Sequence, residues 1–141
     1  MPDFPSRAWC EEALRLLEAD PETVRAGAGW TADIGVVVDA ERGKLDRPFV
    51  VYVRPVDGRV ERWSVLPDPD DLDELDPAYR IRAPYSVWKG VLLGTVDPIE
   101  AVLRRRVDVQ GDIQPLMERL QHKGLAERVL AAIDTRFVDD R

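Results

Sequence analysis

The sequence predicts an α+β fold, in which a largely antiparallel five-stranded sheet is covered on one side by about five helices. Two observations lead to this prediction. The predicted strands cluster, and the early ones are joined by connections short enough for hairpins. Amphipathic helix patterns flank the cluster, and each carries an apolar stripe that must be buried against something. At 141 residues the chain has the size of one domain, and we expect residues 1–141 to form it.

Two helices are predicted before the first strand. Residues 6–19 place four apolar side chains on one face, namely Trp9, Ala13, Leu16 and Leu17. Asp20 then fits the N-cap of a second, short helix, with Pro21 at its first position. Residues 27–29 (Gly-Ala-Gly) form a flexible break that matches no phosphate-binding glycine motif.

Five strands are predicted, at residues 34–40, 49–53, 60–66, 79–83 and 107–109. The second is continuously apolar, which indicates a central strand that is buried on both faces. Asp57 and Gly58 form a tight-turn signal between the second and third strands. Residues 67–77 are acidic and contain several prolines, so we expect a solvated loop with at most one helical turn, capped by Asp68.

Three short helices are predicted within residues 83–120. Pro84 begins the first and Gly94 ends it. Asp97, Pro98 and Glu100 supply an N-cap, a first-position proline and a capping-box acid for the second. The third begins after Asp112. These three apolar stripes could close a core or leave a gap for an apolar ligand, and the residues alone do not decide. A last helix is predicted over residues 125–137.

The composition excludes several classes of function. The hydrophobic fraction is 45% and the charged fraction is 33%, and no apolar run approaches the ~20 residues that span a bilayer. The first residues lack a secretory signal pattern, so we expect a cytoplasmic protein. The net charge of −7 argues against nucleic acid as a partner. The basic run at residues 104–106 fits a helix C-terminus, with an anionic lipid surface as the alternative.

The residues give no catalytic or metal-binding constellation. His122 is the only histidine, and Cys10 is the only cysteine and has no histidine near it in sequence. A lone histidine makes no recognisable metal site, and a thiol without a cationic neighbour is expected to be inert. The acidic residues 68–76 lack the glycine of a calcium-binding loop. For the tryptophans and Met117, core packing and a role in a pocket both remain open.

The chain resembles the sterol carrier protein domain, a lipid-transfer family that occurs alone in prokaryotes and fused to peroxisomal enzymes in eukaryotes. The resemblance rests on an ordered set of short motifs over residues 34–120. These are Trp88 and Gly94 in Trp-Lys-Gly-Val-Leu-Leu-Gly, then Asp97-Pro98, Ala101, Leu103, and the run Val-Asp-Val-Gln-Gly-Asp at residues 107–112.

The resemblance implies an apolar tunnel between sheet and helices that holds a fatty acid, acyl-CoA, phospholipid or sterol without covalent chemistry or a cofactor. It supports an apolar ligand more strongly than a sterol. The implied lining is Trp88, Val91, Leu92, Ile99, Val102, Leu103, Ile113, Leu116, Met117 and Leu120. Residues 67–77 are a candidate cover for the tunnel mouth.

Transient membrane contact and a homodimer are compatible with the resemblance. The alternative function is a dimerisation or protein-interaction module whose pocket is filled or vestigial, because relatives of this fold also occur as accessory domains of larger enzymes. A carrier requires an apolar cavity, whereas an interaction module requires a filled core and an exposed apolar patch.

Overall fold

A computed structural model of the protein describes residues 1–121 and 123–140, apart from the side chains of residues 123 and 125. Five strands form one sheet in the order β4-β3-β2-β5-β6. Their bounds are β2 (Ile34–Asp39), β3 (Phe49–Val56), β4 (Arg59–Leu66), β5 (Tyr79–Pro84) and β6 (Asp108–Gln110). Strands β2 and β5 are parallel, and the other neighbouring pairs are antiparallel. The predicted α+β class with a largely antiparallel five-stranded sheet is confirmed.

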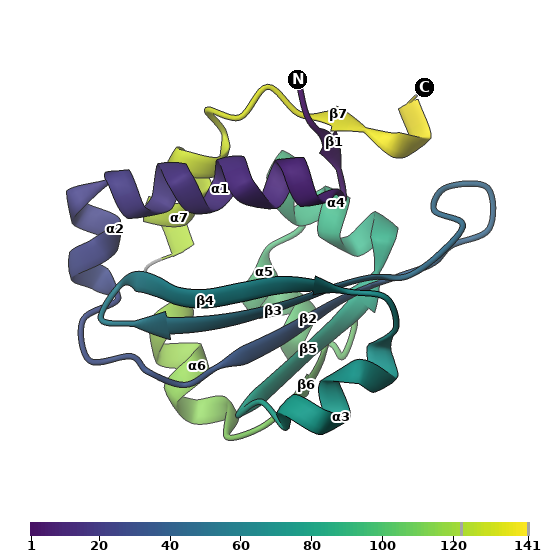
Figure 1. The fold of residues 1–141 in the computed structure, drawn as a ribbon. Coiled ribbons are helices and arrows are strands. Elements are labelled where there is room, and N and C mark those ends of the chain that lie inside the picture. The colour runs from purple at the N-terminus through teal and green to yellow at the C-terminus, as the bar shows by residue number, and fades with distance from the viewer. Residues whose placement is uncertain (122, 141) are drawn as a thin grey trace.

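Helices surround this sheet on both faces. Six of those in the described residues are α1 (Arg7–Ala19), α2 (Pro21–Ala26), α4 (Tyr85–Leu93), α5 (Pro98–Leu103), α6 (Ile113–Leu120) and α7 (Lys123–Leu130). Figure 1 shows α1 running across one face of the sheet, with α4 and α7 beside it. None of the helices in the described part of the chain is long and apolar enough to cross a membrane.

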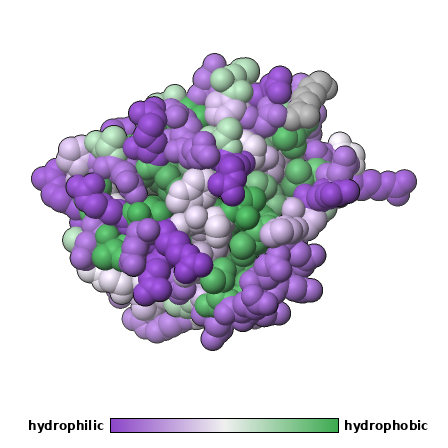
Figure 2. Space-filling model, in the orientation of Figure 1, coloured by the Kyte–Doolittle hydropathy of each residue, from purple (hydrophilic) through white to green (hydrophobic). Residues whose placement is uncertain are grey.

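The other face of the sheet is covered by the acidic segment, which is partly helical. It forms the 3₁₀ helix η1 (Pro69–Asp71) and helix α3 (Leu72–Leu75), and the Asp68 side chain caps η1 as predicted. Leu72 is 1% exposed and packs against Val37 and Val50. A side chain at Gly35 would clash with Leu72, because a Cβ there would lie 2.7 Å from Leu72 Cδ2. In Figure 2, hydrophilic residues surround smaller hydrophobic areas on the face of the molecule that is shown.

The helix boundaries follow the caps that the sequence predicts. Asp20 accepts a hydrogen bond from Thr23 N at 3.0 Å, and Asp97 accepts one from Ile99 N at 3.0 Å. Gly94 ends α4 in the left-handed conformation, with φ of 78°. Asp57 and Gly58 also have positive φ, as a tight hairpin turn between β3 and β4 requires.

The predicted last helix is too long. Helix α7 ends at Leu130, whereas the prediction extended it to Phe137. Asp and Thr are poor helix formers, and residues 134 and 135 lie outside any helix or strand. Thr135 Oγ1 accepts a hydrogen bond from the Trp9 indole at 2.9 Å, and the next residues form β7 (Arg136–Phe137).

Strand β7 pairs in parallel with β1 (Asp3–Phe4), so the first and last strands lie side by side. Phe4 is opposite Phe137 in the register, and Arg136 forms an ion pair with Asp3 at 2.6 Å. The 3₁₀ helix η2 (Val138–Asp140) follows. We call this pair of strands with η2 the clasp (residues 3–4 and 136–140). It was not predicted, because strands of two residues carry no readable alternation.

Candidate functional site

An apolar cavity of about 290 Å³ lies between helices α1 and α4 and strands β2 and β3. Helix α7 and the residues just before α1 complete its wall. The lining residues are Phe4, Pro5, Trp9, Cys10, Ala13, Leu14, Leu17, Val36, Val38, Phe49, Val51, Val53, Trp88, Val91, Leu92 and Leu130. The wall is therefore built almost entirely from aliphatic and aromatic side chains.

The positions of these residues follow from the periodicity of each element. On α1, Trp9, Ala13 and Leu17 recur every four residues and so share one helix face. On β3, alternate residues at 49, 51 and 53 face the cavity, whereas Val50 and Tyr52 face Leu72 on the other side. The continuous apolar run of this strand is thus explained by burial on both faces, as predicted.

The cavity wall has no polar group available for a ligand among the residues that line it. The Trp9 indole N–H donates to Thr135, and the Trp88 indole N–H donates to the carbonyl oxygens of Val37 and Ala83 at 3.1 Å. Burial raises the pKa of the Cys10 thiol to about 11, so the thiol is protonated at neutral pH. This wall can offer only apolar contacts.

The most buried lining residues lie at one end of the cavity, beside the half-buried Phe49, and the other end is lined by half-buried residues. Phe4, Trp9 and Val38 are at most 9% exposed and belong to one core cluster. At the other end, Leu17 and Val53 are half-buried. Helix α1 and strand β3 both run from one end to the other. Glu18, near the C-terminal end of α1, accepts a hydrogen bond from Val60 N, and Val60 pairs with Pro55 near the end of β3. Leu17 and Val53 therefore lie at the same end of the cavity.

Three of the predicted site residues, all on α4, line this cavity. They are Trp88, Val91 and Leu92. The other seven do not belong to the lining, namely Ile99, Val102, Leu103, Ile113, Leu116, Met117 and Leu120. Whether any of the ten binds a ligand stays a prediction.

The seven residues lie elsewhere because α5 and α6 sit beyond the part of the sheet that borders the cavity. Val102 packs in a separate cluster with Ala83, Ala101 and Val107, and Leu116 is buried. Leu103 and Ile113 point outward, with 69% and 44% of their surface exposed. Amphipathic spacing predicts one apolar stripe on each helix, but it does not tell which stripe meets a cavity.

The residues that sequence reasoning missed come mainly from α1 and from strands β2 and β3. The stripe of α1 was recognised, and so was the apolar character of both strands. The resemblance directed attention to residues 83–120 instead, because its motifs lie there. No sequence signal pointed to Phe4 or Pro5, which reach the wall through the pairing of β1 with β7.

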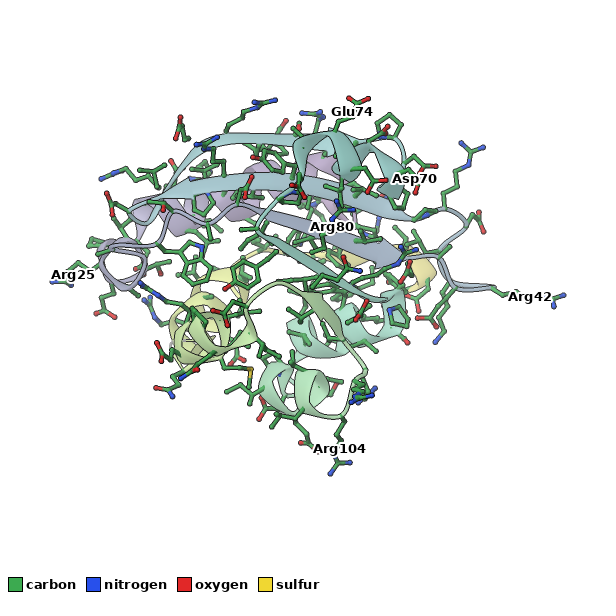
Figure 3. All side chains as sticks on the ribbon, turned by 90° about the horizontal axis from the view of Figure 1, so that it is seen from below. Arg25, Arg42, Asp70, Glu74, Arg80 and Arg104 are labelled. Atoms are coloured by element: carbon green, nitrogen blue, oxygen red, sulfur yellow. The ribbon has the colours of Figure 1, made fainter. Side chains whose placement is uncertain are left out.

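The acidic segment at residues 67–77 does not cover the mouth of the cavity. Helix α3 packs on the opposite face of the sheet, and Arg80 lies near it (Figure 3). Arg80 forms an ion pair with Asp73 of α3. In the described residues, no group of three His, Cys, Asp or Glu side chains could hold a metal ion. His122 lies outside the described residues.

The basic run begins directly after α5, as its sequence position predicts. Arg104 is the C-cap and forms an ion pair with Glu100 at 2.9 Å, and its side chain projects from the surface in Figure 3. Arg105 adopts a left-handed conformation with φ of 59°. All three arginines are exposed.

Comparison with solved structures identifies this architecture. A crystal structure of sterol carrier protein 2 superimposes with a TM-score of 0.77 at 18% identity, covering 93% of this chain and 99% of that one. A conserved hypothetical protein from Thermus thermophilus, described with reservation as a sterol carrier protein, gives 0.72 at 16% identity and covers 92% and 90%. The sterol carrier protein domain 2 of Helicoverpa armigera gives 0.59 at 12% identity and covers 92% and 91%.

A larger enzyme also contains this architecture. A double mutant of the sec-alkyl sulfatase PisA1 matches with a TM-score of 0.50 at 12% identity, over 70% of this chain but only 14% of the enzyme. No protein-family model matches the sequence, and a search of curated proteins finds no match. The structural likenesses, which extend over more than nine-tenths of the chain, show that this protein has the sterol carrier protein fold.

Proposed function

We propose that this protein is a non-enzymatic carrier that binds a fatty-acyl or similarly apolar, lipid-like molecule in the cavity between α1, α4 and the sheet. The observation that carries the proposal is the wall itself. It encloses about 290 Å³, and its two indole N–H groups are already hydrogen-bonded within the protein. In this proposal, residues 1–141 form a single domain that binds the ligand.

The expected affinity follows from burial of hydrocarbon. Each methylene group moved from water into an apolar site contributes ~0.8 kcal/mol, so a chain of about ten carbons gains roughly 8 kcal/mol before costs. Loss of translational and rotational freedom offsets a large part of that gain. We therefore expect dissociation constants in the micromolar range or weaker, and little discrimination among apolar ligands that fit.

Binding without chemistry is the mode that this wall supports. Cys10 is the one titratable side chain in the lining, and its raised pKa keeps it as a thiol rather than a nucleophilic thiolate. The likeness to sterol carrier protein 2 over nearly its whole length agrees with a carrier.

A protein-interaction or dimerisation module is the second candidate. Two observations favour it. The fold occupies a small part of a larger sulfatase chain, and Leu93, Leu103 and Ile113 are exposed on this molecule. It requires a filled core, and the cavity of about 290 Å³ argues against that.

Native mass spectrometry of the purified protein distinguishes the two candidates. Incubation with decanoate should add one decanoate mass to the monomer, and organic extraction should identify any lipid that co-purifies. Ala13→Leu is the matched control, since the added side chain enters the cavity and should abolish the adduct. A protein that takes up no fatty acid at any concentration and forms a stable dimer would instead support the interaction module.

A further inference from the structure

We propose that an acyl chain enters this cavity tail-first and that Phe4 closes the far end, so that affinity stops rising at chains of about ten carbons. This inference rests on the proposed function and adds to it an orientation, a length limit and the residue that sets the limit.

The orientation follows from the wall and its two ends. Phe4, Trp9 and Val38 are buried at one end, and they give a charged or hydroxylated head group no hydrogen-bond partner. A polar group buried without a partner is strongly disfavoured. The half-buried end at Leu17 and Val53 leaves a head group in water. The terminal methyl group therefore points toward Phe4, and the carboxylate or ester stays outside.

Phe4 forms the far end as part of an aromatic cluster. Its ring meets Trp9 edge-on with centroids 5.0 Å apart, and it lies 6.1 Å from the Tyr85 ring and 6.0 Å from the Phe137 ring. Of these four rings, only Phe4 and Trp9 line the cavity. Tyr85 and Phe137 stand behind Phe4 and leave it no room to swing away.

The clasp holds Phe4 in this position. Pairing of β1 with β7 fixes its backbone. On the other side of the cluster, Asp139 accepts hydrogen bonds from the Tyr85 hydroxyl at 2.6 Å and from Lys89 Nζ at 2.9 Å. Residues from both ends of the described chain are thus tied to helix α4, which itself supplies the cavity wall.

The length limit follows from the distance that α1 covers along the cavity. Trp9 and Leu17 are eight residues apart on α1, which corresponds to about 12 Å along the helix axis. A zigzag of ~1.5 Å carbon–carbon bonds advances about 1.25 Å per carbon, so about ten carbons span that distance.

Isothermal titration calorimetry with saturated fatty acids of six to sixteen carbons, each below its micelle concentration, tests the length limit. For the unmodified protein, affinity should rise about fourfold per added methylene and then level off near ten carbons. Phe4→Ala should move the break to chains several carbons longer. If Phe4→Ala does not fold, Phe4→Leu is the substitute. It should move the break in the same direction by fewer carbons.

Phe137→Ala is the matched control, because Phe137 belongs to the same cluster but does not line the cavity. It should weaken the clasp and, because the Phe4 ring itself is retained, move the break by fewer carbons than Phe4→Ala does. Decanoate and its methyl ester should bind within a few-fold of each other if the head group lies outside.

The outcomes separate this inference from the proposed function. No binding at any length would overturn both. Binding whose affinity rises steadily to sixteen carbons, or whose break stays in place in Phe4→Ala and Phe4→Leu, would overturn the length limit alone. A strong preference for the ester over the acid would overturn the tail-first orientation.

Discussion

Two regions of the same sheet face are built from similar residues, yet one is filled and the other is hollow. Between α4, α5 and strands β5 and β6, a cluster around Ala83, Val87, Ala101 and Val107 is closely packed. Between α1, α4 and strands β2 and β3, a cavity of about 290 Å³ remains. The difference shows that apolar composition alone does not decide whether a helix closes a core.

The filled region closes because small residues let its segments approach. Ala101 on α5 is 1% exposed, and its carbonyl oxygen accepts hydrogen bonds from the backbone of Arg106 and Val107. Gly90 on α4 lies so near Val96 that a Cβ there would be 2.4 Å from Val96 Cγ2.

The hollow region stays open because α1 is held by polar contacts near its two ends. The indole of Trp9 donates to Thr135 at one end, and Glu18 accepts from Val60 N at the other. The first contact ties α1 to the segment after α7, and the second ties it to β4 at the edge of the sheet. The residues between them, such as Ala13, do not reach far enough to fill the gap.

A matched pair of leucine truncations gives the largest expected contrast. Leu72→Ala removes a fully packed side chain on the filled opposite face of the sheet and should cost about 2–5 kcal/mol, as is usual for buried leucines. Leu92→Ala only enlarges an existing cavity and should cost roughly 1 kcal/mol or less, while weakening decanoate binding. Urea unfolding and calorimetry measure the two effects. Equal losses of stability would mean that the cavity is filled in solution.

A pair of enlarging substitutions should give the next largest contrast. Ala101→Leu overpacks the filled region and should destabilise the protein by about 1–3 kcal/mol. Ala13→Leu, also within a helix, should leave the free energy of unfolding within about 1 kcal/mol of the original, because the new side chain enters free space. Thermal unfolding of both variants is the measurement. A large loss for Ala13→Leu would remove the basis for the cavity.

The clasp borders the hollow region through Phe4 and gives the stability of the protein a pH dependence. Burial opposes ionisation of Asp139, but hydrogen bonds from Tyr85 and Lys89 outweigh it and lower the pKa of the carboxyl below 3.8. A carboxyl with a lowered folded-state pKa stabilises the fold above about pH 4, and this contribution is lost as the pH falls through the folded value. Asp139→Asn should cost roughly 1 kcal/mol at pH 7.

The difference between Asp139→Asn and the original protein should shrink when unfolding is measured at about pH 3. Asp73→Asn is the control, since Asp73 forms an exposed ion pair with Arg80 and such pairs contribute little. A constant difference from neutral to acidic pH would contradict the assignment to the carboxylate.

The smallest effects are expected at the predicted site residues that lie at the surface. Leu103→Ser and Ile113→Ser should each change stability by no more than about 0.5 kcal/mol and leave the affinity for decanoate unchanged. Calorimetric titration of Leu103→Ser, Ile113→Ser and Leu92→Ala with decanoate compares the three affinities. A loss of affinity at Leu103 or Ile113 would restore them to the binding site.

Most of the fold could be predicted from the sequence, because the signals for it are local. Asp20, Asp97 and Asp112 cap helices where predicted, and alternation placed the five strands of the main sheet within a few residues of their bounds. The clasp could not be predicted, because Asp3–Phe4 pairs with Arg136–Phe137. These strands are short and far apart in the sequence, so no local pattern indicates their pairing.

The candidate site was only partly predictable for a related reason. Trp88, Val91 and Leu92 were found because their motif and their helix stripe coincide. The contribution of α1 depends on how high the helix stands above the sheet, and its polar contacts at Trp9 and Glu18 join it to segments far away in the sequence. Periodicity reports which face of a helix is apolar, but it contains no information on that height.

A crystal structure of the protein with decanoate that carries bromine on its terminal carbon would show whether an acyl chain occupies the cavity tail-first. We predict an anomalous bromine peak inside the cavity, next to Phe4 and Trp9, with the carboxylate near the half-buried end at Leu17 and Val53. A peak at the surface near Leu103 or Ile113, or a cavity that has collapsed with no ligand in it, would contradict both the carrier function and the orientation.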